Sequence, residues 1–584
     1  MVDLNYIDRR LTDSIFIAYD TETTGLDYRA KEACGYVLTF LGEHSKSESH
    51  YLPVRHATGP NLDSDKVESL LRKRLANPKL NVVMHNAAFD LRFAQKHGIE
   101  FGGRIYDTMI MGAMVNENSD SFSLDAQAQQ WGVTPKFKAG INTHLANVFN
   151  LDPKDKTLMS RFWELSADDP IAIKYACGDG DTTWELYDKL AQEIQDQEMM
   201  EVWKVETQLT KILHEMSWRG IKIDEDRLDM IRLVTENLIR QAEEFLPKDL
   251  NVKSPLQMEK LFRDNGITNW PLTAKGRPSF PESWLITNHI GQHVVEARKW
   301  KTLHSSFIMP TIKEHLHNGR LHTEYNQLRA DNYGTISGRL SSSNPNIFNY
   351  PSPKRQPEQG KLFRQIFVSD DDMEMAEADY NQCEPRLVAH YANIRGWIEG
   401  YLSDPPIDAH DSVAKMTGLP RQKGKTISMA LITGAGREKI ISMMGMTERD
   451  GGPLVDKYHA GIPEIKKFQR KATERFRDRG WVRSILGRRF HLTDPRFAYR
   501  ALSRIIQGSN ADIVKMALVK CDAVAKATGA QLLNSIYDSI IWQAEDTITH
   551  GKIAEAMCDL PELKLRVPMT VDLGHGFRWS ECQT

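Results

Sequence analysis

Acidic side chains follow apolar stretches at two places in the N-terminal third of the chain. Asp20 and Glu22 end the stretch Ile15–Tyr19, and because side chains alternate along a strand, the two carboxylates share one face. Asp90 follows a second apolar stretch, Val82–Met84, just inside the expected start of a helix. Carboxylates that converge at strand ends suit two hard cations about 3.5–4 Å apart, which can clamp the attacking and leaving oxygens of an in-line displacement. The pattern predicts metal-dependent hydrolysis.

A helix places the fourth acid. Asp169-Pro170 is a helix-start signal with proline at the first helical position, and Tyr175 and Asp179 then lie four residues apart on one face. Taken singly, each of these acids is more often a helix cap or a surface charge. Asp107 and Asp181 are interpreted as structural. The order and combination of the acids carry the prediction.

Two further acids end strand-like segments in the C-terminal half. The stretch Met375–Ala378 delivers Asp379, and Asp538 lies in a turn between Gln531–Leu533 and Ile540–Gln543. Between them lies a helix that Pro420 opens. Its residues recur every four positions along one face: Arg421, Lys425, Met429 and Thr433. The two cations suit a triphosphate, although such a stripe alone is typical of any amphipathic helix.

The charge of the chain is unevenly distributed. Its 584 residues include 75 Lys or Arg and 78 Asp or Glu, for a formal charge of −3. The segment Glu464–Arg504 alone has thirteen Lys or Arg against four acids. This segment is either a solvated helix face or a surface that contacts phosphates. Charge alone leaves both open.

Composition excludes several classes of protein. Hydrophobic residues make up 41% and charged residues 26%, which is ordinary for globular domains and excludes a largely disordered chain. No apolar run approaches the ~18 residues of a membrane span, and the N-terminus lacks a signal-peptide core, so we expect a cytoplasmic protein without a membrane partner. The six cysteines are scattered without a CxxC pair, which predicts reduced thiols.

The elements that must position these side chains differ along the chain. Residues 1–195 alternate strand and helix patterns, as an α/β domain would, whereas residues 200–330 are mostly helical. The remainder is mixed, with a turn-rich stretch at Gly334–Pro353 and a long helical block at about 385–480. No flexible linker separates these parts, so we expect them to pack directly.

The N-terminal patterns Asp-x-Glu, Asn-x-x-x-Asp and Tyr-x-x-x-Asp, in this order, resemble the three motifs of the DEDD proofreading 3′–5′ exonucleases. The resemblance implies that Tyr175 orients the attacking water and that two divalent metals, Mg²⁺ or Mn²⁺, are bound. The implied metal ligands are Asp20, Glu22, Asp90 and Asp179. Phe89 stands where many relatives carry tyrosine.

From Val205 to the C-terminus the sequence resembles the family A DNA polymerases, so the two resemblances cover nearly the whole chain. They imply an α/β RNase H-like exonuclease domain followed by an α+β right-hand polymerase. The expected domains are exonuclease 1–195, thumb 196–330, first part of the palm 331–390, fingers 391–490 and second part of the palm 491–584.

The polymerase resemblance assigns roles. Asp379 and Asp538 would bind two Mg²⁺ ions that act on the primer 3′-OH and on the triphosphate. Arg339 would check pair geometry in the minor groove, and Glu384 would crowd a ribose 2′-OH. The other implied substrate-binding residues are Arg421, Lys425, His410, Tyr380, Met429 and Thr433. The other implied DNA-binding residues are Gln507, Arg386 and Asn346.

The chain departs from the family around the nascent base pair. Met429 replaces an aromatic residue, Thr433 a tyrosine and Ser503 an asparagine, and the third polymerase motif reads Tyr537-Asp538-Ser539 instead of His-Asp-Glu. These changes lead to the hypothesis of altered purine selectivity, for example toward 2-aminoadenine of some phage genomes. Its extra amino group adds a minor-groove donor.

The leading interpretation is a replicative, proofreading DNA-directed DNA polymerase that acts on primer–template DNA and dNTPs. The short segments before Asp20 and between Ile221 and Lys301 suit a phage or plasmid replicase, with a bacterial repair enzyme as the alternative. We expect a monomer that works with a phage helicase, primase or single-strand binding protein. The first competing hypothesis is a DNA exonuclease whose polymerase-like half does not extend primers. An RNA polymerase or reverse transcriptase is disfavoured by Glu384.

Overall fold

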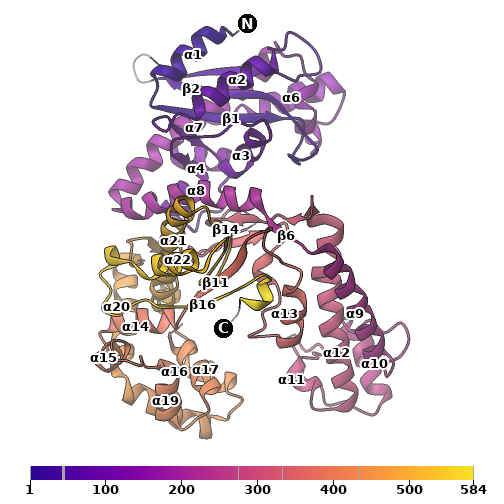
Figure 1. Ribbon diagram of the computed structural model, residues 1–584, viewed down its shortest axis with the longest axis vertical. Coiled ribbons are helices and arrows are strands. Elements are labelled where there is room, and N and C mark those ends of the chain that lie inside the picture. Colours follow the sequence, from indigo (N-terminus) through magenta and orange to yellow (C-terminus); the bar gives the residue numbers. More distant parts are fainter. Residues whose placement is uncertain (1, 43–45, 274, 332, 433, 583–584) are drawn as a thin grey trace.

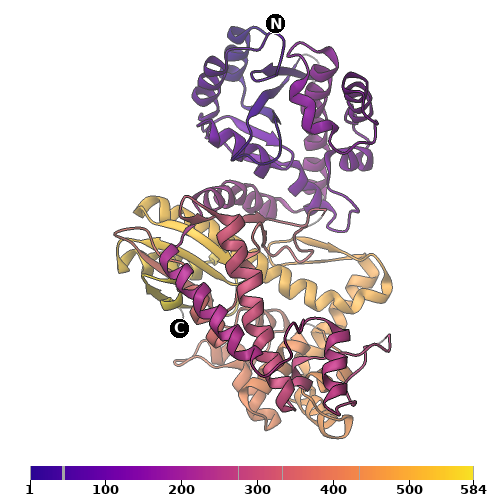
Figure 2. The ribbon, with the colours of Figure 1, turned by 90° about the vertical axis from the view of Figure 1, so that its right-hand side faces the viewer.

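The structure is a computed structural model that describes residues 2–42, 46–273, 275–331, 333–432 and 434–582. An N-terminal sheet domain lies at one end of the long axis, and a second sheet with two helical lobes lies at the other (Figure 1). Figure 2, turned by 90°, shows α8 (Met200–Arg219) lying between the two sheet domains. The predicted order of an α/β domain followed by a mixed α+β region is confirmed.

The N-terminal sheet has the order β3-β2-β1-β4-β5. Its central strand β1 (Phe16–Thr23) runs antiparallel to β2 (Ala33–Leu41) and parallel to β4 (Asn81–Met84). The edges are β3 (Ser47–Pro53) and β5 (Ile105–Asp107). The apolar stretches at Ile15–Tyr19 and Val82–Met84 form strands, as predicted, and the structure makes these strands neighbours.

Helices cover this sheet and bring the fourth acid to it. The longest, α7, begins where Asp169 accepts hydrogen bonds from the amides of Ile171 and Ala172 at 2.8 and 3.0 Å, so the predicted helix start is confirmed. The helices of this domain are α1 (Leu4–Asp13), α2 (Ser64–Leu75), α3 (Ala87–Lys96), α4 (Thr108–Val115), α5 (Leu124–Trp131), α6 (Lys138–Phe149) and α7 (Pro170–Asp196).

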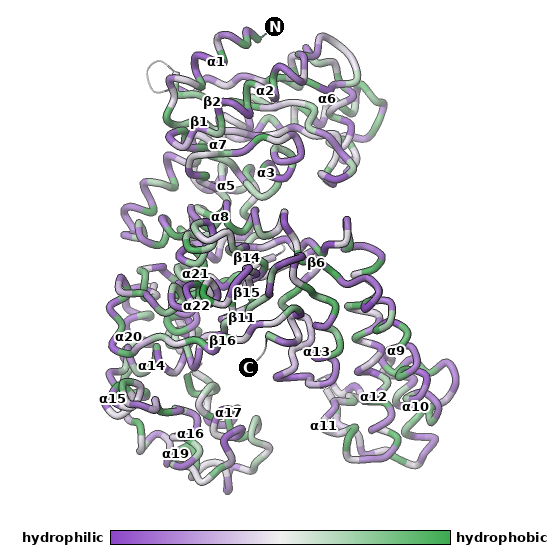
Figure 3. Tube along the Cα trace, viewed as in Figure 1, coloured by the Kyte–Doolittle hydropathy of each residue, from purple (hydrophilic) through white to green (hydrophobic). Residues whose placement is uncertain are grey.

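The second sheet is antiparallel throughout, in the order β14-β15-β11-β16. Its strands are β14 (Gln531–Ile536), β15 (Ser539–Ala544), β11 (Glu374–Tyr380) and β16 (Val571–Gly576). The helices α21 (Ala501–Thr528) and α22 (Thr547–Cys558) pack beside it, and in Figure 3 hydrophobic residues are frequent along them. One continuous core joins α8, this sheet, α21 and the lobe that follows β11.

The two helical lobes extend from this sheet on opposite sides of the view in Figure 1. One lobe comprises α9 (Glu225–Glu243), α10 (Pro255–Asp264), α11 (Glu282–Leu285) and α12 (His289–Leu303). The other comprises α14 (Cys383–Ala392), α15 (Arg395–Tyr401), α16 (Ala409–Thr417), α17 (Arg421–Ile432), α18 (Arg437–Met443), α19 (Glu448–Gly461) and α20 (Pro463–Arg479). The turn-rich stretch Gly334–Pro353 contributes the short strand β10 (Ser341–Ser343), which pairs with β9 (Glu324–Asn326).

All six cysteines are free, which confirms the prediction of reduced thiols. Among the described residues, none of the helices combines the length and the apolar character needed to cross a membrane.

A buried ion cluster ties α8 to α21 beside the second sheet. Glu206 on α8 pairs with Arg488 and with Lys515 on α21, at 2.7 Å for Lys515, and Asp512 pairs with Arg488 at 2.9 Å. Gln327 donates to Glu206 at 2.6 Å. The four charged side chains are at most 4% exposed. Because a buried charge must be paired to be tolerated, this cluster fixes α8 against α21.

Glu206→Gln should destabilise the C-terminal half of the molecule by about 3–5 kcal/mol, because the buried cations Arg488 and Lys515 are then left with Asp512 as their one acid. Guanidinium denaturation followed by tryptophan fluorescence measures the loss. Glu201→Gln, an exposed position on the same helix, is the matched control and should change stability by less than about 0.5 kcal/mol. Equal midpoints for Glu206→Gln and the wild type would contradict a structural role for the cluster.

Candidate active sites

The first acidic cluster lies at the end of β1. Carboxylate oxygens of Asp20, Glu22 and Asp179 lie within 4.8 Å of one another. Asp90, in the first turn of α3, accepts a hydrogen bond at 2.9 Å from the amide of Thr21, the residue between the first two acids. The structure thus brings together the four acids that the sequence predicted as metal ligands, from a strand and two helices.

Burial and the charges of neighbouring acids together raise the pKa values of these carboxyl groups. Burial and the neighbouring charges of Asp20 and Asp179 raise the pKa of Glu22 well above its usual range, and burial and Asp20 do the same for Asp90. Burial also raises the pKa of Asp179 to about 7. One oxygen each of Glu22 and Asp179 is buried without a hydrogen-bond partner among the described residues. Unpartnered buried oxygens of this kind fit divalent metal ions.

A lysine that sequence reasoning missed lies in this cluster. The Nζ atom of Lys136 is 2.5 Å from Oδ2 of Asp179 and 5.3 Å from the ring centroid of Tyr175. Burial opposes its charge, but the surrounding acids, Asp179 first, raise the pKa of Lys136 to about 12. Lys136 belongs to the loop between α5 and α6, outside every motif, so no signal in the sequence indicated it.

The flanking acids have structural roles, as predicted. Asp107 accepts hydrogen bonds from the amides of Met109, Asn86 and Ala87 at 2.8–2.9 Å, so it caps α4 and also holds the turn that precedes α3. Asp181 accepts a hydrogen bond from the hydroxyl of Ser49 at 2.7 Å.

The second acidic cluster lies at the end of β11. Asp379 is paired in register with Ser539 of β15, and the carbonyl of Asp538, in the turn before β15, accepts a hydrogen bond from the amide of Tyr380 at 3.1 Å. The ladder therefore places Asp379 beside Asp538, as the sequence predicted. Burial and the charge of Asp379 raise the pKa of Asp538 to about 6, while Arg339 opposes the rise.

Two cations neutralise this second cluster. The Nζ atom of Lys354 is 2.9 Å from Oδ2 of Asp379, and Arg339 forms an ion pair with Glu384 in the first turn of α14. The second oxygen of Glu384 is buried without a hydrogen-bond partner among the described residues. Lys354 was not predicted from the sequence, because it belongs to the turn-rich segment before α13 (Pro357–Arg364) and to no motif.

Two expected contacts are corrected by the structure. Arg386 is 1% exposed, and its guanidinium donates to the carbonyls of Asn381 and Pro568 and to the hydroxyl of Thr570, so its role is structural and it does not face DNA. The Tyr380 side chain is also buried and donates to the carbonyl of Met557 on α22. Because alternate strand residues face opposite sides, Tyr380 points away from the side of Asp379.

The cationic stripe of α17 begins as predicted. Arg421 and Lys425 are exposed, and Arg421 pairs with Asp408 and, at 3.1 Å, with Asp411. His410, at the start of α16, is buried, and burial together with the charges of Lys425 and Arg421 lowers its pKa, against the pull of Asp408. Farther along the helix Met429 is half-buried. Thr433 lies outside the described residues.

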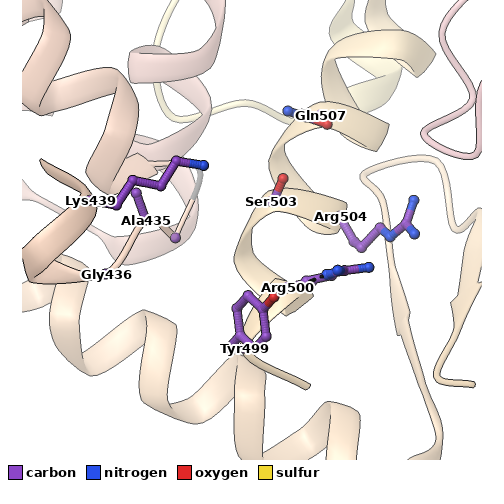
Figure 4. A pocket seen from close by; sticks show the side chains of 9 residues that line it. Ala435, Gly436, Lys439, Tyr499, Arg500, Ser503, Arg504 and Gln507 are labelled. Atoms are coloured by element: carbon purple, nitrogen blue, oxygen red, sulfur yellow. Dashed lines mark hydrogen bonds between the residues drawn. The ribbon is translucent and has the colours of Figure 1, made fainter. Parts of the chain in front are cut away.

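A cavity of about 550 Å³ lies between the segment that joins α17 to α18 and the start of α21. Gln507, Ser503 and Tyr499 line one wall with Arg500 and Arg504, and the segment 434–439 lines the other (Figure 4). Gln507, an expected DNA contact, and Ser503, which replaces an asparagine of the family, thus face a common space from the start of α21. Asn346, a further expected DNA contact, is exposed.

The basic segment Glu464–Arg504 has two parts. On α20 the residues Lys466, Lys467, Arg470 and Lys471 are exposed. In contrast Arg488 is buried in the Glu206 cluster. Only part of the segment is therefore available to phosphates.

Comparisons with known proteins follow the same division. Residues 228–581 match DNA polymerase family A, and residues 2–195 match a 3′–5′ exonuclease family. A DNA-directed DNA polymerase of Pseudomonas phage M6 is 27% identical, over 96% of this chain and 93% of the phage protein. The DNA polymerase DpoZ of Acinetobacter phage SH-Ab 15497 is also 27% identical, over 96% of both chains.

Bacterial relatives are longer than this chain. A DNA polymerase I of Synechocystis is 27% identical over 98% of this chain, which spans 61% of that protein. The solved POL domain of Pol1 from M. smegmatis, in complex with DNA primer-template and dNTP, has a TM-score of 0.79 at 21% identity and covers 97% of this chain, which establishes a shared fold. The chain belongs to DNA polymerase family A and is a DNA-directed DNA polymerase with an N-terminal 3′–5′ exonuclease domain.

Proposed function

We propose that Asp379 and Asp538 hold two Mg²⁺ ions for template-directed extension of a primer, and that the Asp20 cluster holds two divalent metals for proofreading. The observation that carries the proposal is the pairing of Asp379 with the Asp538 turn at one strand end, separate from the four acids on the N-terminal sheet. When bound, such ions lower the pKa of the attacking hydroxyl or water and offset charge on the phosphates.

The side chains around the second sheet would orient the substrates. Arg421 and Lys425 offer two exposed cations on one helical face to a triphosphate, with His410 beside them. Glu384 would exclude a ribose 2′-OH and Arg339 would contact the minor groove, so their ion pair would have to open or shift when DNA binds. The cavity beside Gln507 would receive the templating nucleotide.

We assign residues 1–195 to the exonuclease, 196–330 to the thumb, 391–490 to the fingers and the segments 331–390 and 491–584 to the palm. Within the proposed thumb, α8 packs on α21 and serves as its base. The exposed cations of α20 would contact DNA phosphates. Replication of a phage genome by a monomer, together with a helicase, primase or single-strand binding protein, is the biological role we propose.

Asp379→Ala or Asp538→Ala should lower primer extension by roughly three orders of magnitude or more and leave excision of a mismatched primer intact. Asp20→Ala should do the reverse. Gel assays of one labelled primer–template measure both activities. A wild-type protein that degrades primers and never extends them would instead support an exonuclease with a DNA-binding half.

Arg421→Ala should raise the KM for dNTPs by about 10–100-fold, because a charge-assisted contact is worth about 1.5–3 kcal/mol. Steady-state incorporation of a single nucleotide measures this change. Lys423→Ala is the matched control, since Lys423 is exposed two positions along the same helix and faces another direction. Equal KM values for Arg421→Ala and the wild type would remove Arg421 from the triphosphate site.

The hypothesis of altered purine selectivity concerns the cavity beside Gln507, where Ser503 is a small residue in the wall. It predicts that the triphosphate of 2-aminoadenine is incorporated opposite thymine with a higher kcat/KM than dATP, and that terminal adenine is excised faster. Single-nucleotide insertion and excision assays measure both preferences. Equal kinetics for the two purines would contradict the hypothesis.

A further inference from the structure

Lys136 occupies an unusual place in the exonuclease cluster. Its side chain is 17% exposed, and its ammonium is in contact with Asp179, which is 7% exposed. The neighbouring lysines have other partners: Lys138 pairs with Asp125 at 3.3 Å and is 62% exposed, and Lys174 lies 4.2 Å from the ring centroid of Phe137. Of these three lysines, Lys136 alone is directed at the acids of the cluster.

The loop that carries Lys136 is anchored to the helix that carries Asp179. The amide of Thr134 donates to Glu185 at 2.9 Å, and the carbonyl of Thr134 accepts from the hydroxyl of Thr182 at 2.9 Å. Both partners belong to α7. The backbone near Lys136 is thus held beside the site, while its four-carbon side chain can swing without moving the loop.

Four carboxylates in one buried site repel one another, and a cation among them lowers this repulsion. An ammonium is a compact point charge that donates hydrogen bonds to carboxylate oxygens, and the same oxygens have the lone pairs that a divalent ion needs. Lys136 engages Oδ2 of Asp179, whereas Oδ1 of Asp179 and one oxygen of Glu22 have no partner among the described residues. The ammonium and a metal ion would compete for this carboxylate.

We propose that Lys136 is an internal counter-ion of the exonuclease site: its ammonium takes the place of a cation while metals are absent and is displaced when they bind. The inference rests on the proposed metal site at Asp20. Lys136 is then a positioning residue: its ammonium keeps the acids together, and it lowers the affinity for metal because it competes for the same carboxylate. Excision would then require a higher metal concentration than it would without this lysine.

Mn²⁺ binding to the full chain tests the inference. The chain carries Asp379→Asn and Asp538→Asn, so that the exonuclease site dominates, and calorimetry is done without DNA. Lys136→Met should bind Mn²⁺ with a Kd lower by about tenfold, because a competing charge is removed. Lys136→Arg, which keeps the charge, should stay within about threefold of the wild type. Lys138→Met removes an exposed lysine at the start of α6, two residues after Lys136, and should leave the Kd for Mn²⁺ unchanged.

Thermal unfolding gives a readout independent of binding heat. In EDTA, Lys136→Met should melt below the wild type by several degrees, since the acids lose their cation, and Mn²⁺ should raise its Tm by more than it raises that of the wild type. Mn²⁺ affinity equal to or weaker than wild type in Lys136→Met would overturn the inference. If Asp20→Ala leaves Mn²⁺ binding unchanged, the proposed metal site itself is wrong, and this outcome is distinct from a failure of the Lys136 inference alone.

Discussion

Repulsion between neighbouring carboxylates is the constraint on which the rest of this structure depends. In each of the two sites, burial and then a neighbouring acid raise the pKa of a carboxyl group: Asp379 adds to the effect of burial on Asp538, and Asp20 adds to it on Asp90. Such clusters are unfavourable in a folded protein unless cations balance them. The chain supplies Lys136 to one cluster and Lys354 to the other, and the proposed metals would complete the balance.

Backbone hydrogen bonds at strand ends and helix starts hold the acids in place despite this repulsion. In the first site, the amide of Thr21 holds Asp90 next to the strand that carries Asp20, and Asp107 fixes the turn before α3. In the second, the antiparallel ladder sets Asp379 against the turn of Asp538. The Glu206 cluster then holds α8 on α21. Because α8 also contacts α3 and β5 of the exonuclease domain, both sites are built on one connected scaffold.

Sequence reasoning predicted the parts of this scaffold that local patterns determine. Strand periodicity and the Asp169-Pro170 signal placed Asp20, Glu22 and Asp179 on elements that the structure contains. Lys136 and Lys354 could not be predicted, because a lysine in a loop reaches an acid only through the tertiary fold. For the same reason Arg386 was assigned to DNA, although its guanidinium donates to the carbonyl of Pro568 and the hydroxyl of Thr570, which lie far along the chain. Motif position gives the location of a residue but not the direction of its side chain.

Anomalous diffraction from Mn²⁺-soaked crystals of the full chain tests the central claim most directly, namely that two separate carboxylate clusters are metal sites balanced by internal cations. The account predicts anomalous peaks between Asp379 and Asp538 and among Asp20, Glu22, Asp90 and Asp179, with the Lys136 ammonium moved away from Asp179. Peaks absent from either cluster, or Mn²⁺ bound with Lys136 still on Asp179, would contradict it.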